Sequence, residues 1–293
     1  MTDMIWDANS WWARSWFAAS QSSGRDDPEK AIHFALNTLF GLLFEEKLGF
    51  HFNRTFFAWD CKQIPRKKRK LKPPAYHESK EKLMKLLIAL IGAQNFSHPS
   101  YEADDIVATA VFNAPPEHQI VVFSGDKDLM QLQGGNVAYY CLNSKSMVPT
   151  RTICHKFAIK RPSQVAIALA IIGDRGDGIS GIPKWGPKKV EKLFKAVTEA
   201  VNFESALATI QAQIPEDLLP FFLDSLDKTL LFNDVPGVPE PSELRFCSSR
   251  ELLALGIKEI AQGYERVARQ YEDGEATLDE MLRSSRAPAA QPE

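Results

Sequence analysis

The hydrophobic positions of this chain form two kinds of pattern, short continuous apolar runs and longer segments with helical spacing. The apolar runs predict four buried strands, at residues 4–7, 55–60, 119–124 and 136–142. Helical spacing and helix-start signals predict helices that begin at residues 28 and 103 and helices that cover 80–93 and 162–172. Strands that alternate with helices predict an α/β fold, with a mostly parallel central sheet flanked by helices.

Strand signals fade after about residue 160, where helices and a glycine-rich loop follow. We therefore expect a core over residues 1–160, a helical subdomain over 161–235 and a helical C-terminal extension over 236–293. The Pro- and Ala-rich end of the chain, from residue 287, predicts a frayed tail.

Composition is that of an ordinary globular protein. Of 293 residues, 44% are hydrophobic, and 35 basic against 37 acidic residues give a formal net charge of −2. The four cysteines (Cys61, Cys141, Cys154 and Cys247) lie far apart, which favours reduced thiols over disulfides or a zinc site. The N-terminus lacks a signal-peptide pattern, and no apolar run approaches the ~20 residues that span a bilayer. We expect a cytoplasmic protein without a membrane segment.

Nine acidic residues follow predicted strands or lie at the start of predicted helices and loops. They are Asp7, Asp60, Glu102, Asp104, Asp105, Asp126, Asp128, Asp174 and Asp177. Each alone has an ordinary explanation, because acidic residues commonly cap turns and helices. Together, at the carboxyl ends of parallel strands, they would crowd one cleft. Carboxylates that close cannot all stay ionised unless cations neutralise them, and hard divalent ions with oxygen ligands fit best.

The acidic cluster predicts two Mg²⁺ ions, with Mn²⁺ as a substitute. Two ions about 3.5–4 Å apart would stabilise the attacking and leaving oxygens during hydrolysis of a phosphodiester bond. No zinc pattern, GxSxG elbow, P-loop or GxGxxG motif in the sequence offers a competing chemistry.

Five short motifs and one loop carry a resemblance to a known family. The motifs are Ile5-Trp-Asp-Ala-Asn9, Ala58-Trp-Asp60, Glu102-Ala-Asp-Asp105, Ser124-Gly-Asp-Lys-Asp128 and Gly173-Asp-Arg-Gly-Asp177, and the loop is Gly181-Ile-Pro-Lys-Trp-Gly186-Pro-Lys188. In this order, over about residues 4–235, they resemble the 5′-nuclease superfamily of flap endonucleases, phage 5′→3′ exonucleases and ribonuclease H, and the 5′-nuclease domain of DNA polymerase I. The resemblance implies a PIN-like core and a helix–three-turn–helix hairpin around the loop.

The resemblance also implies a role for each acidic residue. Asp7, Asp60, Glu102 and Asp104 would hold mainly one metal ion, and Asp126, Asp128, Asp174 and Asp177 mainly the second, with Asp105 nearby. Catalytic contacts to the reacting phosphate would come from Arg14 and Lys80, although Lys80 stands where the family has arginine. The implied reaction is attack by a metal-activated water, which leaves a 5′-phosphate product.

Seven basic residues and no acidic one lie between positions 62 and 72. By itself, such a run is as typical of a solvated surface as of a nucleic-acid-binding segment. In the family this region forms a helical arch over single-stranded DNA, which the resemblance places at about residues 61–95, with Tyr76 as a base-stacking ring. The DNA contacts that follow from the arch and the hairpin are Arg66, Lys67, Lys68, Arg69, Lys70, Lys72, Tyr76, Gly181, Gly186 and Lys188.

These inferences predict a structure-specific 5′→3′ nuclease that removes flaps or RNA primers or degrades duplex DNA, in a bacterial or phage-infected cytoplasm. We expect a monomer that acts on DNA with 5′ ends, flaps or RNA primers, with replication proteins as partners. A monovalent cation such as K⁺ is expected at the hairpin. Two alternatives remain open: a non-catalytic DNA-structure-binding protein and a PIN-like endoribonuclease.

Overall fold

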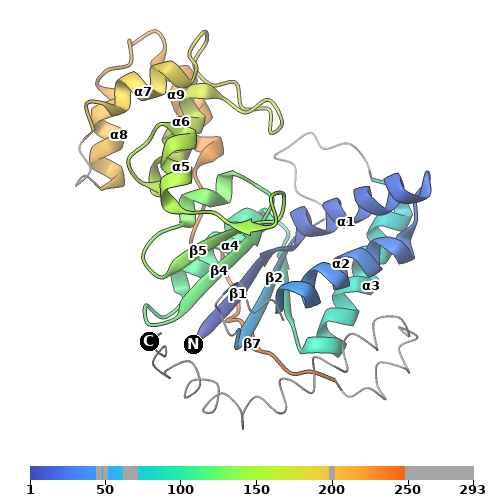
Figure 1. The fold of residues 1–293 in the computed structure, drawn as a ribbon. Helices are drawn as coiled ribbons and strands as arrows, with labels where there is room; N and C mark the ends of the chain where they lie inside the picture. The colour runs from blue at the N-terminus through green and yellow to red at the C-terminus, as the bar shows by residue number, and fades with distance from the viewer. Residues whose placement is uncertain (44–47, 49–51, 62–71, 198–201, 248–293) are drawn as a thin grey trace, which may run out of the picture.

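A sheet forms the centre of the computed structural model, which describes residues 1–43, 48, 52–61, 72–197 and 202–247 (Figure 1). Its strands in these ranges are β1 (Thr2–Asp7), β2 (Arg54–Asp60), β3 (Gln94–His98), β4 (Gln119–Ser124), β5 (Val137–Cys141), β6 (Ser146–Met147) and β7 (Ser242–Glu243). The strand order is β3-β2-β1-β4-β5-β6, with β7 paired to β2 outside this path. The pairs among β1 to β5 are parallel, and β6 and β7 are antiparallel additions. The predicted α/β class and mostly parallel sheet are confirmed.

Helices cover both faces of this sheet. They are α1 (Ala8–Ser23), α2 (Pro28–Leu43), α3 (Pro74–Ile91), α4 (Ala103–Asn113), α5 (Thr150–Phe157), α6 (Val165–Ile172), α7 (Pro187–Phe194), α8 (Phe203–Gln211) and α9 (Leu219–Thr229), with short 3-10 helices η2 (Asp128–Leu132) and η3 (Pro162–Gln164). Helices α1, α2 and α3 lie together on one side, and α5 to α9 form a lobe above the opposite side (Figure 1). None of the helices in the described ranges is long and apolar enough to cross a membrane.

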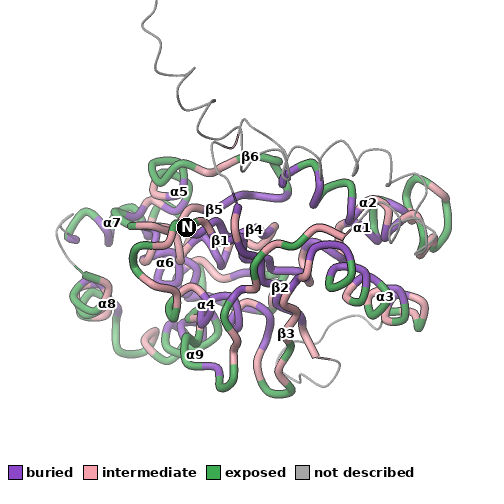
Figure 2. The backbone as a smooth tube through the Cα atoms, turned by 90° about the horizontal axis from the view of Figure 1, so that it is seen from below, coloured by how far each residue is buried: buried purple, intermediate pink, exposed green. Residues whose placement is uncertain are grey.

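Alternate residues of the central strands enter two different hydrophobic clusters. Trp6 of β1 packs in the cluster shared with α1, α2 and α3. Its neighbour Ile5 packs in the cluster shared with α4, α6 and α7. Both side chains are fully buried, and the sheet lies in the buried centre of the molecule (Figure 2). This two-sided burial explains why the strands read as continuous apolar runs rather than alternating ones.

The helical lobe shares its core with the sheet. Val122 of β4, Ile167 of α6 and Phe222 of α9 belong to one buried cluster. The segment after residue 160 is therefore joined to the sheet by a continuous hydrophobic core, although Figure 1 shows it as a separate lobe in outline.

Two elements differ from the sequence-based expectations. Helix α3 begins at Pro74, six residues before the predicted position, because the Pro73–Pro74 pair starts a helix that the apolar spacing of its first turn does not reveal. Strand β3 was not predicted, since its sequence, Gln94-Asn-Phe-Ser-His98, has a single strongly apolar residue. Its backbone pairing with β2 forms this strand.

The predicted helical C-terminal extension is wrong for residues 236–247. This segment contains no helix, and it returns to the sheet, where Ser242 and Glu243 of β7 pair with Thr55 and Arg54. The main-chain N–H of Arg245 then donates to the carbonyl of Ile91 at 3.1 Å. Backbone pairing at the start of β2 thus overrides the local helical pattern. Residues 248–293, and the predicted DNA contacts Arg66 to Lys70, lie outside the described residues.

Candidate metal-dependent active site

An acidic cleft lies at the carboxyl ends of the parallel strands. Its volume is about 300 Å³, and its described lining consists of Asp7, Asn9, Ser10, Ala13, Asp60, Lys72, Tyr76, Ala103, Asp104 and Asp126. Four of the nine predicted carboxylates therefore meet here, from the ends of β1, β2 and β4 and from the first turn of α4. This is the edge of the sheet at which the parallel topology collects ligands.

Asp7 connects the end of β1 to the start of α1. One of its oxygens accepts the N–H of Ser10 at 3.0 Å, which caps the helix, and the other accepts the hydroxyl of Ser124 at 2.6 Å. Burial raises the pKa of Asp7 to about 7, and the nearby charges of Asp126 and Asp104 act in the same direction. Without a cation, this carboxyl group therefore keeps its proton to a higher pH than an ordinary aspartate does. Such a group is well suited to give up its proton when a metal ion binds.

The start of α4 fixes three further carboxylates. Asp60, at the end of β2, accepts the N–H of Ala103 at 2.8 Å, so β2 is tied to the first residue of this helix. Glu102 and Asp105 form a capping box. The oxygens of Asp105 accept the N–H groups of Glu102, at 3.4 Å, and of Phe232, at 3.0 Å. Both residues are buried and neither is among the described residues that line the cleft, so their assignment as metal ligands stays a prediction.

A tight turn after β4 forms the second half of the site. Asp126 accepts the N–H of Asp128 at 3.0 Å, and its own N–H donates to the hydroxyl of Ser124 at 2.8 Å. The buried hydroxyl of Tyr139 stabilises the turn, because it donates to the carbonyl oxygens of Ser124 and Asp126, at 3.0 and 2.7 Å. Carboxylate oxygens of Asp126, Asp128 and Asp177 lie within 4.8 Å of one another. Asp126 thus belongs both to the cleft lining and to this trio.

Lys127 is a functional candidate that the sequence analysis missed. Its ammonium forms an ion pair with Asp174. Burial acts against the charge on Lys127, but the hydrogen bond and charge of Asp174 raise its pKa overall. Burial likewise acts to raise the pKa of Asp174, but the bonds from Lys127 and Gly176 lower it. The sequence signal for this residue was a lysine between two aspartates, in Ser124-Gly-Asp-Lys-Asp128. Its ion pair with Asp174 partly neutralises the negative charge of the site.

The donor set fits hard divalent cations. The trio and the cleft lining offer carboxylate oxygens, with no His or Cys among the described residues of either group. Asp126 is common to the trio and the cleft, so two neighbouring cation positions can share it. The four carboxylates that line the cleft also have structural roles, because Asp7, Asp60, Asp104 and Asp126 accept the backbone N–H groups of Ser10, Ala103, Asp105 and Asp128.

Arg14 and Lys80 lie beside the site, as the resemblance implies. The guanidinium of Arg14 bonds to the side-chain oxygen of Asn143, whose amide nitrogen donates to the carbonyl of Gly125 at 2.8 Å. The ammonium of Lys80 donates to the carbonyl of Asp60 at 2.8 Å and lies 5.3 Å from the ring centre of Trp59. Both cations are therefore held against the strand-end loops that carry the carboxylates. Their contact with a reacting phosphate stays a prediction.

Tyr76 lines the cleft but is mostly buried. Its ring packs against Trp12 and Trp16 at centroid distances of 5.7 and 5.3 Å. The ammonium of Lys72 lies 5.4 Å from the ring centre of Tyr76. Lys72 is exposed and lines the cleft, so it is available to a phosphate, whereas Tyr76 presents only 7% of its surface.

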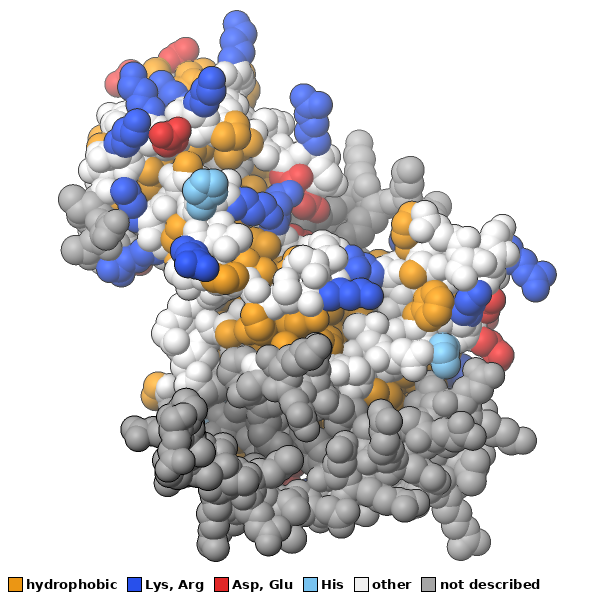
Figure 3. Space-filling model, in the orientation of Figure 1, with side chains coloured by type: hydrophobic (Ala, Val, Ile, Leu, Met, Phe, Trp, Pro, Cys, Tyr) orange, Lys and Arg blue, Asp and Glu red, His pale blue; other side chains and the backbone are white. Residues whose placement is uncertain are grey.

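The predicted hairpin lies between α6 and α7, in a lobe where Lys and Arg side chains gather on the face shown in Figure 3. Lys188 is exposed in the first turn of α7. The N–H of Gly181 is buried and donates to the hydroxyl of Ser225 at 3.1 Å, which differs from the expectation that it faces a DNA phosphate. Gly186 has extended backbone (φ −148°, ψ −170°), which other residues also adopt.

Substitution of the two hairpin glycines by alanine is expected to have opposite outcomes. Gly181 has φ +66°, and an added Cβ would overlap the backbone of Gly173, so Gly181→Ala should lower the free energy of unfolding by at least about 2 kcal/mol. At Gly186 an added Cβ meets no atom within 4 Å, so Gly186→Ala should change it by less than about 0.5 kcal/mol. Urea denaturation of both variants measures the difference, and equal effects would contradict the close packing at Gly181.

Comparison with known proteins identifies the family of this chain and several relatives. The family model for the 5′-3′ exonuclease, N-terminal resolvase-like domain matches residues 2–158. A 5′-3′ exonuclease of Aquifex aeolicus is 26% identical over 221 residues, which cover 72% of this chain and 75% of that protein. The thermostable DNA polymerase I of Thermus thermophilus is 27% identical over 184 residues, 62% of this chain and 22% of that protein.

Solved structures show the same fold at low sequence identity. The T5 5′-exonuclease with bound zinc superimposes with a TM-score of 0.58 and 16% identity, over 78% of this chain and 97% of that one. A T5 flap endonuclease complex with DNA and metal ions gives a TM-score of 0.53, also with 16% identity, over 78% and 96% of the two chains. The family match over more than half of the chain shows that this protein belongs to the 5′-3′ exonuclease family and carries its N-terminal resolvase-like domain.

Proposed function

We propose that this protein is a structure-specific 5′→3′ nuclease that hydrolyses phosphodiester bonds near the 5′ ends of DNA with two Mg²⁺ ions. The convergence of Asp7, Asp60, Asp104 and Asp126 on one cleft, next to the Asp126, Asp128 and Asp177 trio, is the observation that supports it most. The relatives named as 5′-3′ exonucleases and the DNA-bound T5 flap endonuclease support the reaction and the substrate class.

The residues in and beside the cleft would have two roles, to bind the cations and to bind the DNA strand. The carboxylates would bind the ions, which supply Lewis-acid stabilisation of the charge that develops on the phosphate. Lys72, which lines the cleft, and Arg14 and Lys80, which lie beside it, would neutralise phosphate oxygens of the bound strand. Asp7, with its pKa of about 7, would release its proton as the metal-loaded state forms.

The hairpin would bind the duplex part of the substrate. Among the predicted hairpin contacts that the structure describes, Lys188 is best placed to bind the duplex, because it is exposed in the first turn of α7. Contacts to phosphates alone would give affinity without sequence preference, with a strong dependence on salt. A K⁺ ion at the hairpin, a monomeric state and replication proteins as partners remain predictions.

Metal-dependent cleavage is the direct test. A 5′-labelled flap, a nicked duplex and an RNA-primed duplex are incubated with Mg²⁺, with Mn²⁺ and with EDTA. Cleavage near the 5′ end is expected with either ion and none with EDTA. The Asp126→Asn variant, in which the amide oxygen can still accept the N–H of Asp128, is expected to lose at least about a hundredfold in rate while keeping its fold.

The same substrates separate the alternatives. Salt-sensitive binding of branched DNA without cleavage under any metal condition would favour the DNA-structure-binding protein. Cleavage confined to single-stranded RNA would favour the PIN-like endoribonuclease. The ratio of flap to nicked-duplex cleavage measures the balance between endonuclease and exonuclease action.

A further inference from the structure

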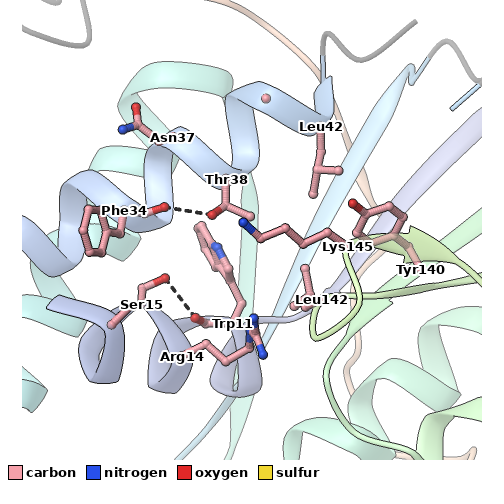
Figure 4. A pocket seen from close by; sticks show the side chains of 12 residues that line it. Trp11, Arg14, Ser15, Phe34, Asn37, Thr38, Leu42, Tyr140, Leu142 and Lys145 are labelled. Atoms are coloured by element: carbon pink, nitrogen blue, oxygen red, sulfur yellow. Dashed lines mark hydrogen bonds between the residues drawn. The ribbon is translucent and has the colours of Figure 1, made fainter. Parts of the chain in front are cut away.

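A second hollow lies beside the metal cleft, between α1, α2 and the β5–β6 hairpin. Its volume is about 620 Å³, within the range of small-molecule sites. We call it the α1–α2 pocket, and define it by Trp11, Arg14, Phe34, Gly41, Leu142 and Lys145 (Figure 4). It shares helix α1 with the metal cleft, but none of the described residues that line it lines that cleft.

The α1–α2 pocket combines an apolar floor with a cationic rim. Trp11, Leu42 and Leu142 are buried beneath it. Arg14 reaches it from α1 and Lys145 from the β5–β6 hairpin (Figure 4). Its described lining contains neither Asp nor Glu, in contrast to the neighbouring cleft. A ligand that fits this lining carries a negative charge at one end and a flat apolar group at the other.

Two of the three hydroxyls in the described lining, those of Ser15 and Thr38, are already used inside their own helices. Thr38 donates to the carbonyl of Phe34 at 2.9 Å, and Ser15 to that of Trp11 at 3.0 Å (Figure 4). Arg14 and Lys145 are the charged side chains of the described lining, so they favour an anionic ligand.

Lys145 occupies its place at a conformational cost. Its φ is +52°, in the left-handed region that favours glycine, and this costs an L-residue such as lysine some stability. A glycine would satisfy the hairpin turn better, so the turn alone does not explain a lysine. The lysine at this position adds a cation to the rim of the pocket.

Helix α1 and Asn143 connect the pocket to the reaction site. Ser10 lines the metal cleft and Arg14 lines the pocket, one helical turn and about 6 Å further along α1. Asn143 bonds to both Arg14 and the carbonyl of Gly125, next to Asp126. A strand held with one phosphate at the cleft would place a neighbouring nucleotide at the pocket.

We propose that the α1–α2 pocket binds one nucleotide of the substrate strand, next to the phosphate at the metal cleft. The nucleotide's own phosphate lies between Arg14 and Lys145, and its base lies against the apolar part of the lining, where Phe34 is a partly exposed aromatic ring. This assignment rests on the proposed nuclease function, but binding of a nucleotide can be measured without cleavage.

Two variants test the pocket without threatening the fold. Lys145→Gly removes the rim charge and relieves the left-handed backbone. Gly41→Leu fills the pocket from the last turn of α2, where an added Cβ meets no atom within 4 Å. Lys82→Ala is the matched control, since Lys82 is an exposed lysine of α3 outside the pocket lining.

Binding is measured first on the full chain in EDTA, with dAMP and with inorganic phosphate as probes. We expect dAMP to raise the melting temperature of the wild type and of Lys82→Ala, and phosphate to raise it less. Lys145→Gly and Gly41→Leu should lose most of the dAMP shift while melting no lower than the wild type without ligand. An equal shift with phosphate and dAMP, or an unchanged shift in both pocket variants, overturns the proposal.

Cleavage kinetics with Mg²⁺ then assign the pocket to the substrate strand. The KM for a 5′ flap should rise about tenfold in Lys145→Gly and in Gly41→Leu, with kcat within about twofold of the wild type. If the wild type cleaves the flap and the KM of both variants is unchanged, the assignment is overturned. A wild type that binds dAMP through this pocket but cleaves nothing overturns the proposed function and leaves the nucleotide site standing.

Discussion

The Asp7→Asn variant is expected to lose nuclease activity and to be more stable than the wild type at pH 8 without divalent metal. The asparagine oxygen can still accept the N–H of Ser10, and its amide group can meet the hydroxyl of Ser124, so both bonds of Asp7 have a substitute. The variant lacks the negative charge of the Asp7 carboxylate. A bound cation needs this charge, but burial makes it unfavourable in the metal-free protein.

The sign of the pH dependence follows from the raised pKa. The ordinary pKa of 3.8 applies to the unfolded chain, and the folded value is about 7. Between these values the folded protein binds the extra proton, so the stability of the wild type falls as the pH rises, and above about 7 the loss is complete. At about 1.4 kcal/mol per pKa unit, a shift from 3.8 to about 7 limits this loss to about 4 kcal/mol.

Urea denaturation in EDTA at pH 4 and pH 8 measures this effect. The two proteins should be nearly equal at pH 4, and Asp7→Asn should be more stable at pH 8. Addition of Mg²⁺ should stabilise the wild type more than the variant, because the ion binds through the missing carboxylate. If Asp7→Asn were less stable than the wild type by the same amount at both pH values, this result would contradict burial as the cause of the raised pKa.

The Arg54→Met variant is expected to lose about 3–5 kcal/mol of stability, the range for breaking a buried ion pair. Arg54 of β2 lies opposite Asp3 of β1, and its guanidinium donates to both carboxylate oxygens, at 2.8 and 2.6 Å. Asp3 is fully buried, so the substitution would leave a buried carboxylate without its guanidinium partner, with the ring of His118 3.1 Å away. The Asp3 bond raises the pKa of Arg54, although burial opposes it.

Arg245→Met is the matched control for Arg54→Met. Arg245 pairs with Glu243 at 3.4 Å on the surface, where both side chains are largely exposed, so its loss should cost less than about 1 kcal/mol. Urea denaturation of both variants at pH 7 gives the comparison. Equal losses would show that the buried pair does no more for stability than a surface pair.

The carboxylates show how far sequence reasoning reaches into this site. Asp7, Asp60 and Asp126 were predicted from local rules, because each follows an apolar run that only a buried strand explains. Parallel topology then placed them at one edge. The sequence could not separate their two roles, since capping of α1 by Asp7 and support of α4 by Asp60 depend on backbone geometry.

Partners from distant parts of the chain were beyond sequence reasoning. Lys127 reaches Asp174, 47 positions away, and Asn143 reaches Arg14, 129 positions away. The helical pattern after residue 236 was misleading for the same reason. Pairing of β7 with β2 supplies backbone bonds that the local pattern does not contain.

The sequence by itself determined the α/β class, the strand ends that carry the acidic residues, and the resemblance to 5′ nucleases, because these follow from hydrophobic spacing and short motifs. The tertiary structure alone decided which carboxylates share a cleft, which ones also cap helices, and where the α1–α2 pocket lies beside them. It also decided the buried pair of Asp3 and Arg54. These features arise where separate segments pack, and packing fixes distances and burial that no local pattern encodes.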